Sequence, residues 1–239
     1  AYATYVGQEI GQFYGWVYEG IARTQDELDG HATQQGANVG DCLYKDISGP
    51  EGTPDGVIDA YDQTVLGSGL PKVNFGLSTH MEYKGFDLNI STYGVLNYHV
   101  TDDIYNSLNS CYGYGNKDVA MLDANRWSED GSTYLSSVPR TYAANNATLG
   151  WNDLFSSRKI QNAAYWKIAN IELGYNFPDK WFGGYVSGVR LYVSAQNLYT
   201  FTGYKGYNVD YAGGTFTPGY NFCSFPSART FMCGLHFTF

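Results

Sequence analysis

The chain has 239 residues, of which only 15% are charged, and it contains 29 glycines, 23 tyrosines and 13 phenylalanines. Its net charge of −9 argues against nucleic-acid binding, because phosphate recognition needs clustered lysine and arginine side chains. No apolar run approaches the roughly 18 residues of a membrane-spanning helix, so a helical membrane protein is excluded. A sequence that is rich in aromatic residues and poor in charged ones favours strands with one face turned away from water.

The first long segment without strand periodicity, residues 23–72, contains the sharpest acidic cluster. Its four carboxylates are those of Asp46, Asp55, Asp59 and Asp62. Carboxylate oxygens in a glycine-bearing loop can gather around Ca²⁺ or Mg²⁺, which predicts a metal site within residues 46–62. The spacing of an EF-hand is absent, and an acidic loop held by turns of aspartate side chains onto the backbone is the alternative.

Residues 73–95 predict two strands around a very short turn at 83–85. Apolar and polar side chains alternate along both strands, which is the period of a strand. The apolar faces comprise Phe75, Leu77, Thr79, Met81 and Tyr83 on the first strand, and Phe86, Leu88, Ile90 and Thr92 on the second.

Three later segments, 167–177, 188–201 and 230–239, have the same period. The last has a wholly apolar face, formed by Phe231, Cys233, Leu235, Phe237 and Phe239. Strands of about ten residues with one apolar and one polar face suit a barrel that contacts lipid outside and water inside. A soluble β-sandwich produces the same alternation, so periodicity alone does not separate the two folds.

The connections between the strands separate the two folds better. They alternate between long and short, at 23–72, 83–85, 97–164, 178–187 and 202–228. Membrane barrels alternate in this way, with short periplasmic turns and long extracellular loops, whereas compact soluble domains seldom carry several loops above about 15 residues. The predicted fold is all-β: about six antiparallel strands of a transmembrane β-barrel.

No arrangement of side chains points to catalysis. The four histidines are scattered, no nucleophile and base occur at a known spacing, and the four cysteines lack the spacing of a zinc site. The predicted protein is therefore not an enzyme. Flat aromatic side chains in the long loops suit sugar rings or peptide side chains, with packing inside their own loop as the alternative. The candidates are Tyr112, Tyr114, Trp127, Trp151, Tyr204, Tyr207, Tyr211 and Tyr220.

Four stretches of the chain resemble the SusC/RagA family of outer-membrane transporters. Residues 11–16 read GQFYGW, residues 83–88 read YKGFDL, and residues 164–175 with 190–198 read AYWKIANIELGY and RLYVSAQNL. Residues 40–46 and 55–62, GDCLYKD and DGVIDAYD, are similar to a conserved acidic segment of the family. The family's Asn-Gly-Asp centre is replaced here by Ser48-Gly49 and an insertion through Pro54, which weakens the metal interpretation.

The resemblance implies that residues 1–239 are the C-terminal portion of a large transmembrane β-barrel. The barrel would be a component of a TonB-dependent importer in the outer membrane of a Gram-negative bacterium, with the loops outside the cell. It implies four partners: an N-terminal plug and further barrel polypeptide, the TonB complex acting through the plug, a SusD-like surface lipoprotein, and lipid. The expected substrates are oligosaccharides, with peptides second. The alternative is a structural or adhesin barrel without transport. Phe239 resembles the terminal aromatic residue that barrel-assembly machinery recognises.

Overall fold

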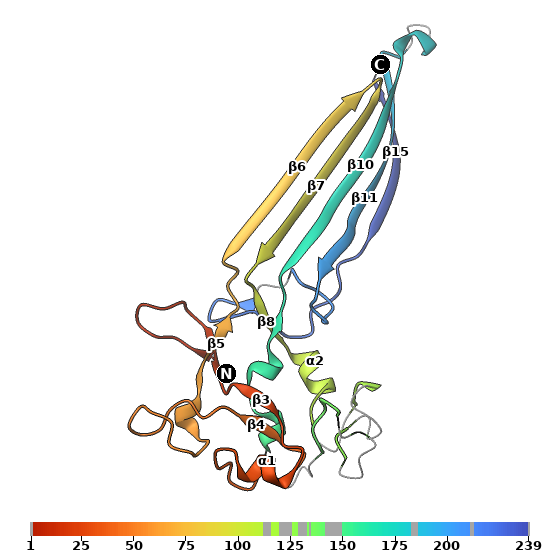
Figure 1. The fold of residues 1–239 in the computed structure, drawn as a ribbon. Coiled ribbons are helices and arrows are strands. Elements are labelled where there is room, and N and C mark those ends of the chain that lie inside the picture. The colour runs from red at the N-terminus through yellow and green to blue at the C-terminus, as the bar shows by residue number, and fades with distance from the viewer. Residues whose placement is uncertain are drawn as a thin grey trace. The chain divides into compact units, whose positions relative to one another are not determined.

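The computed structural model describes residues 2–111, 116–119, 126–128, 133, 135–141, 150–182, 186–210 and 213–238 (Figure 1). The chain forms two compact units. The sheet unit consists of Pro71–Tyr98, Asn162–Asp210 and Ser224–Phe239, and the loop unit consists of Ala1–Leu70, His99–Gln161 and Tyr211–Cys223. Among the described residues, no helix is both long and apolar enough to cross a membrane.

The sheet unit is built on one antiparallel sheet with the strand order β15-β11-β10-β7-β6, whose neighbouring strands run side by side in Figure 1. Its strands are β6 (Val73–Tyr83), β7 (Phe86–Leu96), β10 (Tyr165–Phe177), β11 (Gly188–Thr202) and β15 (Thr230–Thr238), and the 3₁₀-helix η6 (Asp179–Phe182) follows β10. All the long strands predicted by periodicity are confirmed. In the described part of the chain the sheet has five strands, against the expected number of about six.

The turn between β6 and β7 shows why this hairpin is so tight. Lys84 and Gly85 have φ angles of 49° and 88°, so both central residues lie in the left-handed region that a two-residue hairpin turn requires. Tyr83 then pairs with Phe86, Met81 with Leu88 and Thr79 with Ile90. The pairing places the predicted apolar positions of both strands on one face.

This apolar face continues over the other three strands and is open to the surroundings. Leu88 pairs with Leu173, and Leu191 pairs with Leu235. Leu77 is 64% exposed and Leu235 is 57% exposed. An apolar surface that extends across five strands is far larger than the patches that water-soluble monomers expose, and it matches the lipid-facing side of a membrane barrel.

Aromatic rings lie at both ends of the apolar face. At the end with the short turns, the Phe86 and Tyr175 rings are 4.6 Å apart. At the other end, Trp166 stacks on Phe201 at 5.1 Å, and Tyr199 lies 4.7 Å from Phe201. The sequence already shows the first group, because aromatic residues such as Phe86 and Phe177 flank the two short turns. Two aromatic belts that bound an aliphatic band are the pattern found at the two surfaces of a membrane.

A β-bulge brings Trp166 into the second belt, whereas Tyr199 and Phe201 follow the regular alternation of β11. The pairing of β10 with β7 shifts between Ile168 and Asn170, so Ala169 is an extra residue. An extra residue reverses the side to which all following side chains point. Trp166 and Ile168 therefore join the apolar face, while Lys167, opposite Tyr93, joins the polar face.

The loop unit contains short strands and short helices. Its strands are β1 (Tyr2–Ala3), β2 (Gln12–Gly15), β3 (Tyr18–Ile21), β4 (Cys42–Tyr44), β5 (Thr64–Ser68), β8 (His99–Asp102), β12 (Gly213–Gly214), β13 (Thr217–Pro218) and β14 (Tyr220–Asn221), with β9 (Gln161–Asn162) at its boundary. Its helices are α1 (Gln25–Asp29), α2 (Asp103–Leu108), η1 (Ala60–Asp62), η4 (Gly150–Asp153) and η5 (Ser157–Lys159). Phe13, Tyr44 and Val100 are buried in its core. The predicted long loops are thus folded against one another.

Candidate functional site

A charged network lies on the polar face of the sheet, towards the end with the short turns. The Arg190 guanidinium donates two hydrogen bonds to the Asp87 carboxylate and one of 2.7 Å to Glu172 Oε1. Asn176 adds a bond of 3.2 Å to Asp87 Oδ2. These side chains come from three neighbouring strands, β7, β10 and β11, so the network ties the strands together on the face opposite to the apolar one.

Gly174 makes room for this network. A Cβ atom at position 174 would lie 2.3 Å from Asp87 Oδ2 and 2.5 Å from Arg190 Nη2. Both distances are shorter than any van der Waals contact. The absence of a side chain at Gly174 is therefore what allows Arg190 and Asp87 to meet across β10.

Gly174→Ala is expected to lower the free energy of unfolding by about 1–3 kcal/mol, because it displaces charge-assisted hydrogen bonds from the buried carboxylate of Asp87. The measurement is the denaturant midpoint of the purified protein in detergent. Gly76→Ala is the matched control, since a Cβ atom there lies at an ordinary 3.6 Å from Thr92 O. Equal losses for the two variants would contradict this role of Gly174.

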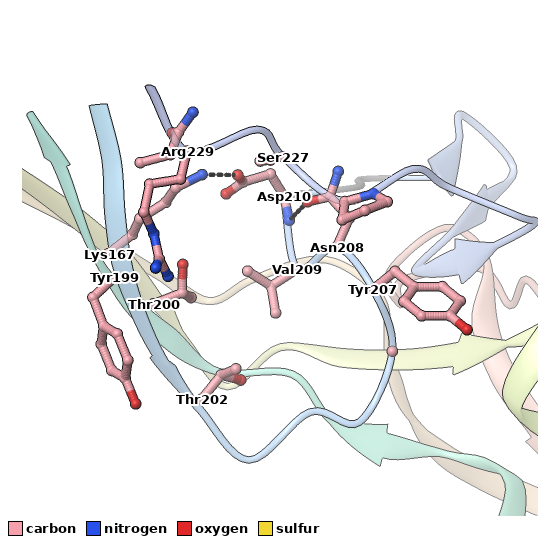
Figure 2. Close-up of a pocket in the computed structure, with 13 residues that line it drawn as sticks. Lys167, Tyr199, Thr200, Thr202, Tyr207, Asn208, Val209, Asp210, Ser227 and Arg229 are labelled. Carbon is pink, nitrogen blue, oxygen red and sulfur yellow. Dashed lines mark hydrogen bonds and ion pairs between the residues drawn. The ribbon is translucent and has the colours of Figure 1, made fainter. Parts of the chain in front are cut away.

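A cavity of about 310 Å³ lies at the opposite end of the sheet unit (Figure 2). Lys167 lines it, is only 3% exposed and forms an ion pair of 2.5 Å with Asp210 Oδ2. The Tyr93 hydroxyl donates a hydrogen bond of 3.3 Å to Asp210 Oδ1. The remaining lining residues are Asn197, Tyr199, Thr200, Thr202, Gly206, Tyr207, Asn208, Val209, Pro226, Ser227 and Arg229. Most of these side chains are polar, as binding of a polar ligand requires.

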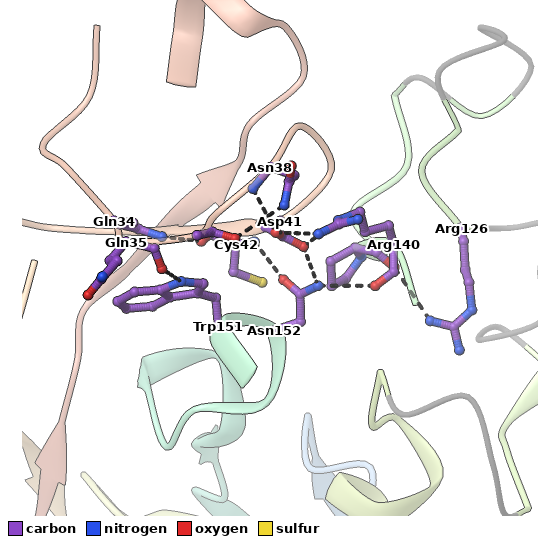
Figure 3. A network of polar contacts seen from close by, with 11 residues as sticks. Gln34, Gln35, Asn38, Asp41, Cys42, Arg126, Arg140, Trp151 and Asn152 are labelled. Atoms are coloured by element: carbon purple, nitrogen blue, oxygen red, sulfur yellow. Dashed lines mark hydrogen bonds and ion pairs between the residues drawn. The ribbon is translucent and has the colours of Figure 1, made fainter. Parts of the chain in front are cut away.

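A second polar cluster holds the loop unit together (Figure 3). The Asp41 carboxylate is 2% exposed and accepts two hydrogen bonds from Arg140, of 2.7 and 2.8 Å. It also accepts one from Asn152 Nδ2 at 2.8 Å and one from the Asn38 backbone N–H at 2.9 Å. Asp41 comes from the 23–72 segment and Arg140 from the 97–164 segment. This cluster therefore joins two segments that the sequence presents as separate loops.

The backbone next to Asp41 can adopt this arrangement only because of Gly40. Its φ angle is 93°, and a Cβ atom there would lie 2.4 Å from the Trp127 ring. Asn152 Oδ1 accepts a hydrogen bond of 2.7 Å from the Cys42 backbone N–H. The two segments are therefore joined by a hydrogen bond to the Cys42 backbone as well as by the ion pair between Asp41 and Arg140.

The predicted ligand-binding aromatics are spread over different surroundings. Trp127 and Tyr204 are buried, which agrees with the alternative of packing inside the protein. Trp151 packs 6.2 Å from the Tyr44 ring, and Tyr220 packs 6.4 Å from Phe222. Tyr207 is 62% exposed and lines the cavity of Figure 2. Tyr112, Tyr114 and Tyr211 lie outside the described residues, as does Phe239.

The acidic segment uses its carboxylates to bind backbone N–H groups. Asp62 accepts from Ile47 N at 2.7 Å and forms a reciprocal capping pair with Asp59 at η1. Asp46 accepts from Gly56 N, and Asp55 accepts from Val57 N. Within the described ranges, no three His, Cys, Asp or Glu side chains are grouped to hold a metal. These contacts are those of the alternative interpretation, and Ca²⁺ or Mg²⁺ binding stays a prediction.

The cysteines are all unpaired. Cys42 and Cys111 are buried, and burial raises the pKa of the Cys42 thiol to about 12. Cys233 is on the apolar face, opposite Val193. Cys223 is exposed and lines a second cavity, of about 710 Å³, in the loop unit. Of the four, only Cys223 combines exposure with a position outside the long strands.

Comparison with known proteins agrees with this architecture. The sequence is 30% identical to TonB-dependent receptor P3 of Formosa agariphila over 98% of the chain, and 28% identical to TonB-dependent receptor SusC of Bacteroides thetaiotaomicron over 77% of it. Over nearly its whole length the chain is therefore similar to TonB-dependent receptors, which confirms the resemblance to the SusC/RagA family. No protein-family model matches the sequence.

The fold is also that of a solved transporter. The RagAB peptide transporter superposes on 96% of this chain with a TM-score of 0.73 at 22% sequence identity. The chain spans 22% of the length of receptor P3, 17% of SusC and 23% of the superposed RagAB chain. The chain therefore corresponds to about a fifth of the length of the proteins it resembles.

Proposed function

We propose that this chain forms part of the wall and of the outer loops of a TonB-dependent nutrient importer. The observation that carries the proposal is the five-stranded sheet, with an exposed apolar face, two aromatic belts and a charged polar face. Relatives named TonB-dependent receptors support it over most of the chain. The apolar face contacts outer-membrane lipid, and the polar face lines the lumen.

The remaining parts of the importer lie outside residues 1–239. Five strands cannot close a barrel that holds a plug, and an open sheet edge is not tolerated in lipid. The edges of β6 and β15 therefore pair with further barrel strands. The TonB complex supplies energy through the plug, and a SusD-like surface lipoprotein covers the loops. The similarity to SusC and to RagAB supports these partners.

The proposed substrates are oligosaccharides or peptides. The alternative, a structural or adhesin barrel, requires neither energy coupling nor a lipoprotein. A strain that lacks the gene encoding this chain is grown on oligosaccharide and peptide mixtures as the limiting nutrient. We expect a growth defect that is reproduced by deletion of TonB, and a surface lipoprotein that co-purifies with the tagged transporter. Unchanged growth together with no co-purified lipoprotein would support the structural barrel.

The topology is tested by the reactivity of thiols in intact cells. A membrane-impermeant maleimide is expected to label Cys223, which is exposed in the 202–228 segment, and to leave Cys42 unlabelled. Cys42 is buried, and with a pKa of about 12 its thiolate fraction stays low from pH 7 to pH 9, so raising the pH over this range does not start its labelling. Peptide mapping by mass spectrometry identifies the labelled cysteine.

Two variants serve as controls for the labelling. Cys223→Ser removes the expected label, and Lys84→Cys places a thiol in the short turn, on the periplasmic side of the proposed barrel. Labelling of Lys84→Cys in intact cells, with Cys223 unreactive, would show that the chain has the opposite orientation.

A further inference from the structure

Arg229 differs from Lys167, the other cationic residue that lines the cavity of the sheet unit. It is exposed, lines the cavity and, within the part of the chain that the structure describes, has no hydrogen-bond or ion-pair partner. Lys167, in contrast, is buried and neutralised by Asp210 at 2.5 Å. The cavity therefore has one guanidinium charge in excess (Figure 2), in a chain with a net charge of −9.

The backbone on both sides of Arg229 is fixed. Asn197 Nδ2 donates a hydrogen bond of 2.9 Å to the carbonyl of Ala228, and Thr230 pairs with Gln196 at the start of β15. Asn197 has a φ angle of 51° and lies in the irregular part of the β10–β11 pairing, between Gln196 and Tyr199. The irregular stretch of β11 thus places Asn197 where it holds Ala228, the residue before Arg229.

The other lining groups suit an anion with further polar atoms. Asn208 Oδ1 accepts from the Asp210 backbone N–H at 2.9 Å, which leaves its amide N–H groups available to donate. Ser227 and Thr200 line the same cavity and add hydroxyl donors. The Asp210 carboxylate is held by Lys167 and Tyr93, so its charge is compensated before any ligand enters.

We propose that this cavity is a subsite for a carboxylate group of the imported substrate, with Arg229 as its principal ligand. A guanidinium binds a carboxylate through two parallel N–H···O hydrogen bonds, which gives both strength and orientation. The carboxylate is the C-terminus of a peptide or the acid group of a uronic-acid oligosaccharide. The inference rests on the proposed import function and specifies the chemistry that one of its binding sites recognises.

The test uses the purified full-length transporter and two pairs of probes. The first pair is hexa-alanine with a free C-terminus and its C-terminal amide; the second is trigalacturonate and its methyl ester. We expect the free acid of one pair to bind at least about tenfold more tightly than its neutral partner, as is typical when a charge-assisted bond is gained. The pair in which the free acid binds more tightly identifies the source of the carboxylate.

Arg229→Gln is expected to abolish this preference for the free acid. Arg229→Lys should retain part of it, because an ammonium group keeps the charge but not the paired geometry. Lys205→Gln is the matched control: it removes one charge from the same connection, and Lys205 does not line the cavity. The preference should survive in this control variant.

The subsite is overturned if neither free acid binds more tightly than its neutral partner, if neither binds at all, or if Arg229→Gln and Lys205→Gln have equal effects. Growth on the oligosaccharide and peptide mixtures, with and without TonB, is measured separately in cells. If growth depends on TonB but Arg229→Gln does not change the preference for the free acid, the subsite is ruled out and the importer is still supported. If growth does not depend on TonB, the importer itself is ruled out.

Discussion

Replacing Arg140 with glutamine is expected to lower the stability of the loop unit by about 3–5 kcal/mol. Asp41 is 2% exposed, and Arg140 supplies two of the four hydrogen bonds to its carboxylate. Removing one partner of a buried ion pair leaves a charge that neither water nor another cation compensates. The loss is expected within the loop unit, because all the partners of Asp41 belong to it.

Hydrogen exchange of the backbone N–H groups of residues 38–44 reports this local stability. Cys42 N donates to Asn152 Oδ1, so its exchange should accelerate in Arg140→Gln. The double variant Asp41→Asn with Arg140→Gln should recover part of the stability, because the uncompensated carboxylate is gone. Lys45→Gln, an exposed cation in the same unit, controls for the loss of charge. If the double variant is less stable than Arg140→Gln alone, the buried charge is not the cause.

The long strands were predictable from the sequence because lipid and water act on opposite faces of each strand. Every residue of β7 from Phe86 to Thr92 lies on the face that its polarity predicted, as the pairing with β6 shows. A one-residue shift would place charged side chains in the apolar face, so the register is strongly specified. The family resemblance came from the same strands and their turns, and the comparisons confirm it.

The bulge at Ala169 was not predictable in this way. An extra residue in a strand has no signature of its own when its neighbours, such as Ile168, fit either face. The bulge has a large effect. Strict alternation from Ile171 would place Lys167 on the apolar face, whereas the bulge places Lys167 on the polar face, where its side chain meets Asp210. The candidate site depends on that reversal. Of the predicted aromatic candidates in the described residues, only Tyr207 lies at the cavity.

The folding of the long loops into one unit could likewise not be predicted from the sequence. Asp41 and Arg140 are 99 positions apart, and neither has a local pattern that indicates its partner. Glycines such as Gly40 mark turns in any loop, whereas the contact with Trp127 that requires this one is visible only in the structure. Contacts of this kind depend on chain topology, on which local periodicity carries no information.

The last prediction concerns the side of the sheet that faces lipid. Ile90 lies near the middle of the apolar face, between Thr79 on β6 and Ile171 on β10. Ile90→Arg is expected to lower the stability of the barrel by about 2–4 kcal/mol, because the guanidinium must be placed near the centre of the bilayer. The loss appears as a smaller fraction of folded transporter in outer-membrane preparations.

Asn89→Arg is the matched control, one residue along the same strand. Asn89 is on the polar face, where it accepts a hydrogen bond from His80 Nδ1 at 2.6 Å and pairs with Glu172 across the sheet. An arginine there remains in the proposed aqueous lumen, close to carboxylates that attract it, so the expected loss of folded transporter is much smaller. Because the two substitutions introduce the same side chain at adjacent positions, their difference isolates the environment of each face. Equal losses at Ile90 and Asn89 would mean that the apolar face does not contact lipid, and the membrane-spanning assignment of these strands would have to be abandoned.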